Sequence, residues 1–286
     1  MQSPAMRFRM RGAQSRQTLI NILGVSIGIL FLLPIMWLII TSISPSSAMG
    51  KYPPDLFPTH PTFSNYKDAF TSYSIGDFLL NSVIVDTAST ALVVCLGSCA
   101  AYALARTRMR GKLSILVALL IVSTFPIVTV VAPLYAIFRA LGLLDSYQAL
   151  IIPYTALHLP FAIWLMRNYF ITIPFEMEES GQVDGASALR IIVQLIVPQA
   201  VPGIFVAATL TFAACWQEFL LSLSFNPVPG HQTVPVGINL MTGYAGSVPY
   251  ETVFAASVVA LLPIVILVIG MRKWVIGGIG SGAVKG

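Results

Sequence analysis

Long apolar runs separated by short polar segments dominate the chain. Six runs reach about 18 residues or more, the length that a helix needs to cross the hydrocarbon core of a bilayer. They cover residues 19–42, 78–105, 113–138, 149–170, 198–225 and 252–271. Because backbone groups in lipid must be hydrogen-bonded within the segment, we expect each run to be a helix. The pattern predicts an all-α polytopic membrane protein with six transmembrane helices in one domain, residues 19–274.

Positive residues fall mainly on one side of the predicted membrane. Thirteen of the 16 lysines and arginines lie before the first run, between the second and third, around and after the end of the fourth, and after the sixth. The opposite side holds Lys51, Lys67 and Arg139. Since short cytoplasmic loops are enriched in Lys and Arg, we expect both termini to be cytoplasmic. The resulting segments are cytoplasmic ends 1–18 and 275–286, external loops 44–77 and 226–251, and a cytoplasmic loop 171–197.

The composition argues against a water-soluble globule. Hydrophobic residues make up 56% of the 286 residues, charged residues only 9%, and the mean hydropathy is +0.83. Soluble domains carry about a quarter charged residues, so this chain has too few charges to cover a surface in water. The net charge of +5 is explained by the membrane topology. We therefore expect lipid as a partner and no binding of nucleic acid.

The cytoplasmic loop 171–197 differs from the other connections. Four of the eleven acidic residues lie between Glu176 and Asp184. Pro174 suits a helix start, and acidic residues in a first turn are favoured by the helix dipole. Gly185 suits a helix end or a turn. We expect a helix, a glycine turn and a second helix beneath the membrane. On these residues alone, a knob for a cytoplasmic partner and a solvated connector are equally good interpretations.

The same loop resembles the EAA loop of ABC-importer permeases. The family form is Glu-Ala-Ala, three residues, Gly, nine residues and Ile-x-Leu-Pro. Glu179, Gly185 and Pro198 match this form by identity, while Ser180 and Gly181 stand at the two alanine positions. These two substitutions lower the intrinsic helix propensity of the loop.

Further segments resemble the carbohydrate-uptake, MalG-like branch of these permeases. Glu178 and the triplet 184–186 agree with its usual loop sequence, and Trp-Gln-Glu-Phe at 216–219 is similar to its Trp-Asn-Glu-Phe. Residues 277–286 resemble the ending of the MalG type. The likeness runs in matching order over nearly the whole chain, which is thereby identified as a binding-protein-dependent transport inner-membrane component.

The resemblance implies a permease subunit of an ATP-driven importer for a sugar or related solute, with di- or oligosaccharides as the expected class. A coupling helix would dock on a cytoplasmic ATPase, Glu179 would pair with a basic residue there, and ATPase closure would drive alternating access. The implied coupling residues are Glu178, Glu179, Ser180, Gly181, Asp184, Gly185 and Ala186. The implied partners are two ATPase copies, a second permease forming a heterodimer and an extracytoplasmic solute-binding protein, in a prokaryotic cytoplasmic (inner) membrane.

Motifs for catalysis are absent from the sequence. No segment has the phosphate-loop form G-x-x-x-x-G-K-[ST], whose glycine-rich backbone cradles nucleotide phosphates. Neither HExxH nor GxSxG occurs, which argues against an intramembrane enzyme. We expect a non-catalytic subunit with no metal site and no cofactor of its own, ATP and Mg being bound by the partner ATPase.

Polar side chains inside the predicted spans are candidates for the solute pathway. Such side chains are costly in lipid and usually face the interior of a helix bundle. The candidates are Asn81, Trp216, Gln217 and Glu218. Glu218 is suited to hydrogen-bond a hydroxyl-rich solute, and Trp216 is suited to stack on the same solute. A structural hydrogen bond between helices accounts for Glu218 equally well.

The alternative hypothesis is a secondary transporter or channel. Its ion or proton path would use the intramembrane residues Asp86, His158 and Glu218. Such a protein needs no ATPase, and it would leave the segment 178–185 without a purpose. Within the third run, Pro126 and Pro133 predict a bend, because proline interrupts the hydrogen-bond ladder of a helix.

Overall fold

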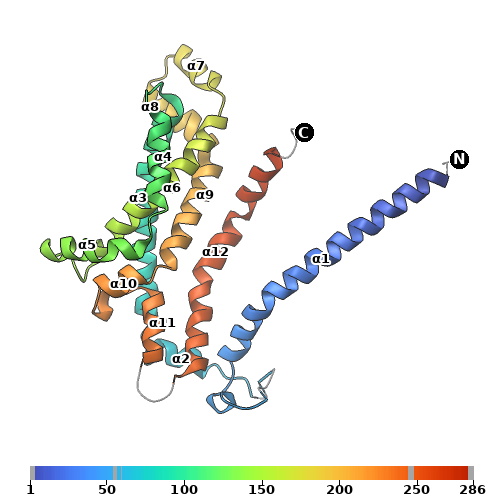
Figure 1. Cartoon of the computed structure of the whole chain (residues 1–286), viewed down its shortest axis with the longest axis vertical. Helices are drawn as coiled ribbons and strands as arrows, with labels where there is room; N and C mark the ends of the chain where they lie inside the picture. The colour runs from blue at the N-terminus through green and yellow to red at the C-terminus, as the bar shows by residue number, and fades with distance from the viewer. Residues whose placement is uncertain (1–3, 54–56, 59, 244–247, 283–286) are drawn as a thin grey trace. The chain divides into compact units, whose positions relative to one another are not determined.

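The computed structural model describes residues 4–53, 57–58, 60–243 and 248–282 (Figure 1). The described residues form helices joined by turns and loops, with no strand among them, as the all-α prediction requires. The chain divides into two compact units. The first contains Met1–Ser72 and Gly246–Val259, and the second contains Tyr73–Ala245 and Ala260–Gly286.

The first unit contains α1 (Pro4–Ser42), η1 (Ser46–Ala48), α2 (Ser64–Thr71) and the beginning of α12 (Tyr250–Gly282). Asn65 of α2 donates hydrogen bonds to the carbonyl oxygens of Ser42 (2.9 Å) and Ser44 (2.8 Å). The Ser42 hydroxyl is hydrogen-bonded to the Tyr66 hydroxyl at 2.7 Å. These contacts fasten part of the predicted external loop 44–77 to the end of α1.

The second unit is built around a long helix, α3 (Ile75–Arg106), which packs against α6 (Gln148–Thr172) and α9 (Val197–Trp216) (Figure 1). A Cβ atom on Gly203 of α9 would collide with the ring of Tyr169 on α6. A residue without a side chain at this point lets the two helices approach closely, as small residues do between membrane helices. Helix α4 (Lys112–Ser123) packs on α6 from another side.

The third apolar run is broken. Helix α4 ends at Ser123, and α5 (Ile127–Ala140) leaves at an angle of 89°. Pro126 between them has an extended backbone (φ −64°, ψ 126°), so the chain leaves the helical conformation there. The bend is confirmed at Pro126, whereas α5 continues through Pro133 and a single continuous third helix is wrong. The described residues contain five helices long and apolar enough to cross a membrane, or up to six if this bent pair is one span.

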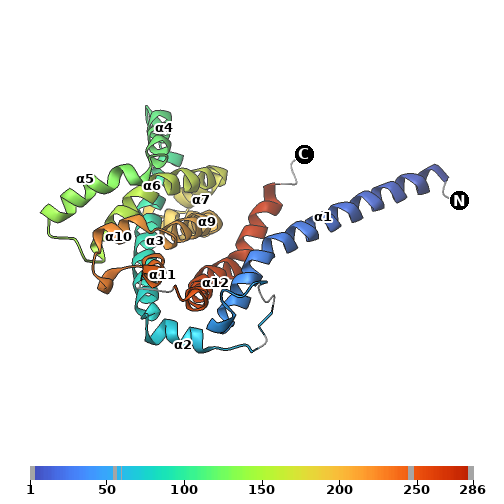
Figure 2. The same ribbon diagram turned by 60° about the horizontal axis from the view of Figure 1, so that its bottom comes forward.

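The fifth run is also divided. Its spanning segment is Ala188–Trp216, and a separate short helix, α10 (Leu220–Phe225), follows. Helix α10 packs on α5 (Figure 2). The Phe138 and Phe225 rings lie 5.5 Å apart at this contact. Within this unit α11 (Val234–Gly243) lies at the opposite end of the bundle from α7 (Glu176–Val183) (Figure 1).

Candidate functional site

Helix α7 occupies the centre of the predicted cytoplasmic loop and begins with acidic residues in its first turn. Its end is closed by Gly185, whose φ of +75° lies in the left-handed region. The amide of Gly185 donates to the carbonyl oxygen of Gln182, and the amide of Ala186 donates to that of Gly181, both at 3.0 Å. This pair of bonds is the Schellman motif, which satisfies carbonyl groups left free at a helix end.

A second helix follows the glycine turn, as predicted. Ser187 is the N-cap of α8 (Ala188–Ile191), and its side chain accepts a hydrogen bond from the amide of Arg190 at 3.4 Å. Helix α8 continues through a π-helical turn, η2 (Ile192–Ile196), into α9. The glycine turn is thus joined to a membrane-spanning segment without an intervening loop.

The predicted coupling residues divide between two faces of α7 and its turn. Glu179, Ser180, Asp184 and Gly185 are exposed, and Ala186 is half-buried. Gly181 is buried: a Cβ atom there would lie 2.9 Å from Cδ1 of Leu195 and 3.0 Å from Cγ1 of Ile191. This contact with the following helix explains why a small residue stands at this position.

Glu178 is the second buried residue of α7 and is only 5% exposed. Its carboxylate forms an ion pair with the Arg106 guanidinium (Nε–Oε1 2.5 Å) and accepts a hydrogen bond from the Tyr102 hydroxyl at 3.1 Å. Both partners belong to the last turns of α3. Glu178 therefore faces its own chain, away from the surface that a docking partner would contact.

Two exposed apolar side chains flank the glycine turn and were not identified from the sequence. Val183 is 88% exposed and Leu189 is 71% exposed. Leu189 also lines a shallow groove, together with Gly185, Ser187, Arg190, Val193 and Gln194. A sequence signal did exist, since position 183 falls on the exposed face with Glu179, one helical turn away.

Three of the four pathway candidates, Trp216, Gln217 and Glu218, lie at the junction of α9 and α10. Trp216 is 7% exposed, and its indole N–H donates to the carbonyl oxygen of Ala260 on α12 at 3.1 Å. Glu218 accepts hydrogen bonds from the Tyr154 hydroxyl (2.6 Å) and from the amides of Leu221 (2.8 Å) and Ser222 (3.3 Å). It therefore caps the start of α10 and ties it to α6. These contacts favour the structural interpretation of Glu218.

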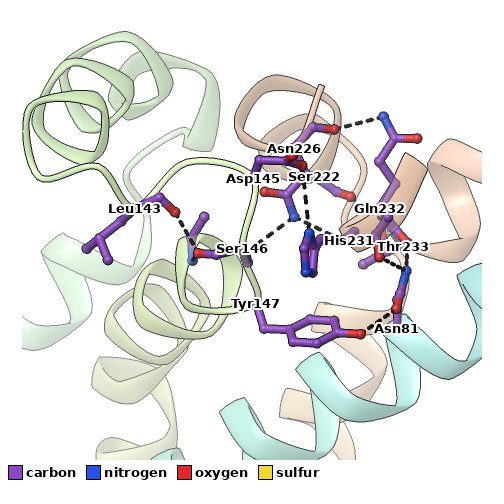
Figure 3. Close-up of polar contacts among 12 residues, drawn as sticks. Asn81, Leu143, Asp145, Ser146, Tyr147, Ser222, Asn226, His231, Gln232 and Thr233 are labelled. Carbon is purple, nitrogen blue, oxygen red and sulfur yellow. Dashed lines mark hydrogen bonds and ion pairs between the residues drawn. The ribbon is translucent and has the colours of Figure 1, made fainter. Parts of the chain in front are cut away.

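The remaining candidate, Asn81, lies in a polar cluster near the start of α3 (Figure 3). Its side-chain amide donates to the carbonyl oxygens of Gly230 (3.1 Å) and Gln232 (3.0 Å) and accepts from the Tyr147 hydroxyl (2.8 Å). The His231 ring stands edge-on to Tyr147 at 4.8 Å between centroids. Asn81 thus fastens the segment after α10 to α3 and α6. Gln217, between Trp216 and Glu218, is exposed.

The residues of the alternative ion path have different surroundings. Asp86 is fully buried in α3, and its carboxylate oxygens have no hydrogen-bond partner among the described residues. His158 is half-buried in α6. The described part of the chain contains no group of three His, Cys, Asp or Glu residues arranged to hold a metal ion.

Comparisons with known proteins identify the family. Residues 93–280 match the family described as "Binding-protein-dependent transport system inner membrane component". The chain is 40% identical over 255 residues to the sulfoquinovosyl glycerol transport system permease protein SmoH of Agrobacterium fabrum, with 89% of each chain covered. It is 33% identical to the trehalose/maltose transport system permease protein MalG of Thermococcus litoralis, covering 97% of this chain and 100% of the relative.

A solved structure shares the fold. It is that of a bacterial ABC transporter involved in the import of the acidic polysaccharide alginate, with a TM-score of 0.76, 21% sequence identity, and 96% of this chain and 98% of that chain covered. The agreement of the family match, the similar full-length relatives and the helical architecture shows that this chain belongs to the binding-protein-dependent transport system inner membrane components, the permease subunits of ABC importers.

Proposed function

We propose that this permease subunit carries a sugar or a related glycoside, with di- and oligosaccharides as the expected class. The names of several relatives support this class. They are permease proteins of transport systems for sulfoquinovosyl glycerol, for trehalose, and for trehalose and maltose. A competition assay tests it. Uptake by the reconstituted importer should be inhibited by unlabelled di- or oligosaccharides and not by amino acids, and inhibition by amino acids alone would contradict the proposal.

We further propose that α7 is the coupling helix, docked on a cytoplasmic ATPase. The observation that supports this best is the division of α7 into two faces. Its inner face is held by Glu178 and Gly181, while its outer face exposes Glu179 and Val183 above a closed glycine turn. A fixed inner face and a free outer face suit a rigid element that is moved from outside.

The subunit itself performs no catalysis in this proposal. ATP and Mg are bound by two ATPase copies, a second permease completes a heterodimer, and an extracytoplasmic binding protein delivers the solute. A second structure of an alginate ABC transporter, in complex with a periplasmic protein that holds an alginate pentasaccharide, supports the last of these partners. The dependence of the whole family on a binding protein supports it as well. The positive-residue bias supports cytoplasmic termini and a cytoplasmic α7.

A pull-down tests the ATPase contact. The chain is purified in mild detergent from its native membrane, and its companions are identified by mass spectrometry. We expect an ATPase and a second permease to co-purify, and Glu179→Lys to weaken the ATPase association alone. Asp68→Lys is the control, because Asp68 is an exposed acidic residue of α2 in the predicted external loop 44–77.

The opposite result would identify the alternative function. A chain that purifies without an ATPase, and that transports its solute when ATP is absent, is a secondary transporter or a channel. Asp86, His158 and Glu218 would then be the first residues to replace.

A further inference from the structure

The inner face of α7 is joined to α3 by an ionic latch, which consists of Tyr102, Arg106 and Glu178. The Glu178 carboxylate lies 2.5 Å from Nε of Arg106 and 3.1 Å from the Tyr102 hydroxyl oxygen. The Arg106 and Glu178 side chains are only 11% and 6% exposed. The charges are therefore largely shielded from water, which strengthens their attraction relative to a surface pair.

The same two α3 residues hold the chain segment that leads into α7. The Arg106 guanidinium donates to the carbonyl oxygen of Ile173 at 2.9 Å and lies 5.8 Å from the centre of the Phe175 ring. The Tyr102 ring stands edge-on to Phe170, with centroids 5.8 Å apart. The last turns of α3 thus contact the end of α6, the link that follows it and α7 itself.

The position of the latch matters for the transmission of movement. The chain itself joins α7 to α6 before it and to α8 and α9 after it. Helix α3 is distant in sequence and reaches α7 through side chains. Helix α3 also packs along α6 and α9. A displacement of α7 therefore moves α3, α6 and α9 together only if α3 is displaced with α7.

An ion pair suits this task better than an apolar contact. A buried ion pair generally stabilises a fold no more than apolar residues of similar volume would. Its geometry is more restrictive, however, because the carboxylate must face the guanidinium and the hydroxyl together. Glu178 also lies next to Glu179, so the inner attachment and the expected outer contact are on adjacent residues.

We propose that Glu178 is a positioning residue, which transmits the displacement of α7 to α3 through Arg106 and Tyr102. This inference rests on the proposed docking of α7 to an ATPase. Glu178 itself contacts neither the solute nor the ATPase. Its loss should therefore uncouple ATP hydrolysis from transport while the ATPase remains bound.

The test uses the assembled importer in proteoliposomes and measures the solute transported per ATP hydrolysed. Glu178→Gln keeps the shape of the side chain and removes its charge. We expect the transport-to-hydrolysis ratio to fall roughly threefold to thirtyfold, the range by which residues between two sites modulate their coupling. The ATPase that co-purifies should be unchanged. Asp68→Asn, at an exposed position of α2 in the predicted external loop 44–77, should keep the parental ratio.

A charge exchange distinguishes positioning from mere packing. Arg106→Glu combined with Glu178→Arg should restore much of the ratio that either single change removes. A parental ratio in Glu178→Gln would overturn the proposal, and so would a loss of ATPase in parallel with transport or a failure of the exchange to restore coupling. If Glu178→Gln does not insert, Tyr102→Phe takes its place: it removes one hydroxyl and should lower the ratio more modestly, and an unchanged ratio would overturn the proposal.

The Glu179→Lys variant separates this inference from the function on which it rests. If Glu179→Lys leaves the ATPase bound, α7 is not the docking element and the proposed function fails. If Glu179→Lys releases the ATPase while Glu178→Gln keeps full coupling, the latch alone is refuted.

Discussion

Glu178 and Glu179 are neighbours in the sequence and lie on different faces of α7. The first is 5% exposed and paired with Arg106, whereas the second is exposed. Successive residues of a helix point about 100° apart, so one glutamate can hold the helix to its own chain while the other remains free for a partner. This difference divides the expected coupling residues into positioning and docking residues.

The conformation of Gly185 predicts the effect of adding a side chain. Gly185→Ala should destabilise the end of α7 by about 1–2 kcal/mol, because a left-handed backbone is strained for residues with a Cβ atom. Apart from the glycine and its chain neighbours, no atom of the described residues lies within 4 Å of the Cβ position, so the effect is conformational and not steric. Hydrogen exchange of residues 176–187 measures it. Gly185→Asn should cost less, and equal exchange in both variants would contradict this explanation.

Gly181 should respond to the size of the new side chain. Gly181→Ala should be nearly neutral, because the closest atom is the mobile end of Leu195 and alanine favours the helix by about 1 kcal/mol. Gly181→Leu should destabilise the subunit by about 1–3 kcal/mol through overpacking. Thermal unfolding in detergent compares the two, and a similar loss in both would contradict the packing argument.

The cap formed by Glu218 predicts a loss of stability. Glu218→Ala leaves the amides of Leu221 and Ser222 without their acceptor, which should cost about 1–3 kcal/mol. Gln217→Ala, at the exposed neighbouring position, is the control and should leave the unfolding temperature unchanged. If Glu218→Ala instead keeps parental stability and raises the KM for the solute, the side chain belongs to the pathway.

The exposed side chains of Val183 and Leu189 should be anchors for the ATPase. Replacing either by serine should weaken ATPase association by about tenfold or more, since a few buried apolar anchors dominate most interfaces. The thermal stability of the isolated subunit should not change, because neither side chain is buried in it. Gln182→Ser is the control at an exposed polar position, and an equal loss there would argue against anchoring.

Local patterns sufficed for some features. The length of the apolar runs predicted the spanning helices, and Pro126 predicted the bend in the third run. Gly185, with acidic residues before it, predicted a helix, a turn and a second helix. These features depend on the backbone and on near neighbours, so their causes lie within a few residues. The domain boundaries drawn from the sequence remain predictions.

Other features depended on residues distant in the chain. Nothing within the segment 171–197 indicates that Glu178 meets Arg106, 72 positions earlier, and only the packing of α6 on α3 brings them together. The same holds for Glu218 and Tyr154 on different helices. The sequence by itself determined a membrane-embedded, all-helical protein with a helix, a glycine turn and a second helix between its fourth and fifth apolar runs, because hydropathy and turn chemistry act locally. The tertiary structure alone decided which polar side chain is buried and paired, because burial is created by elements that meet only in the folded chain.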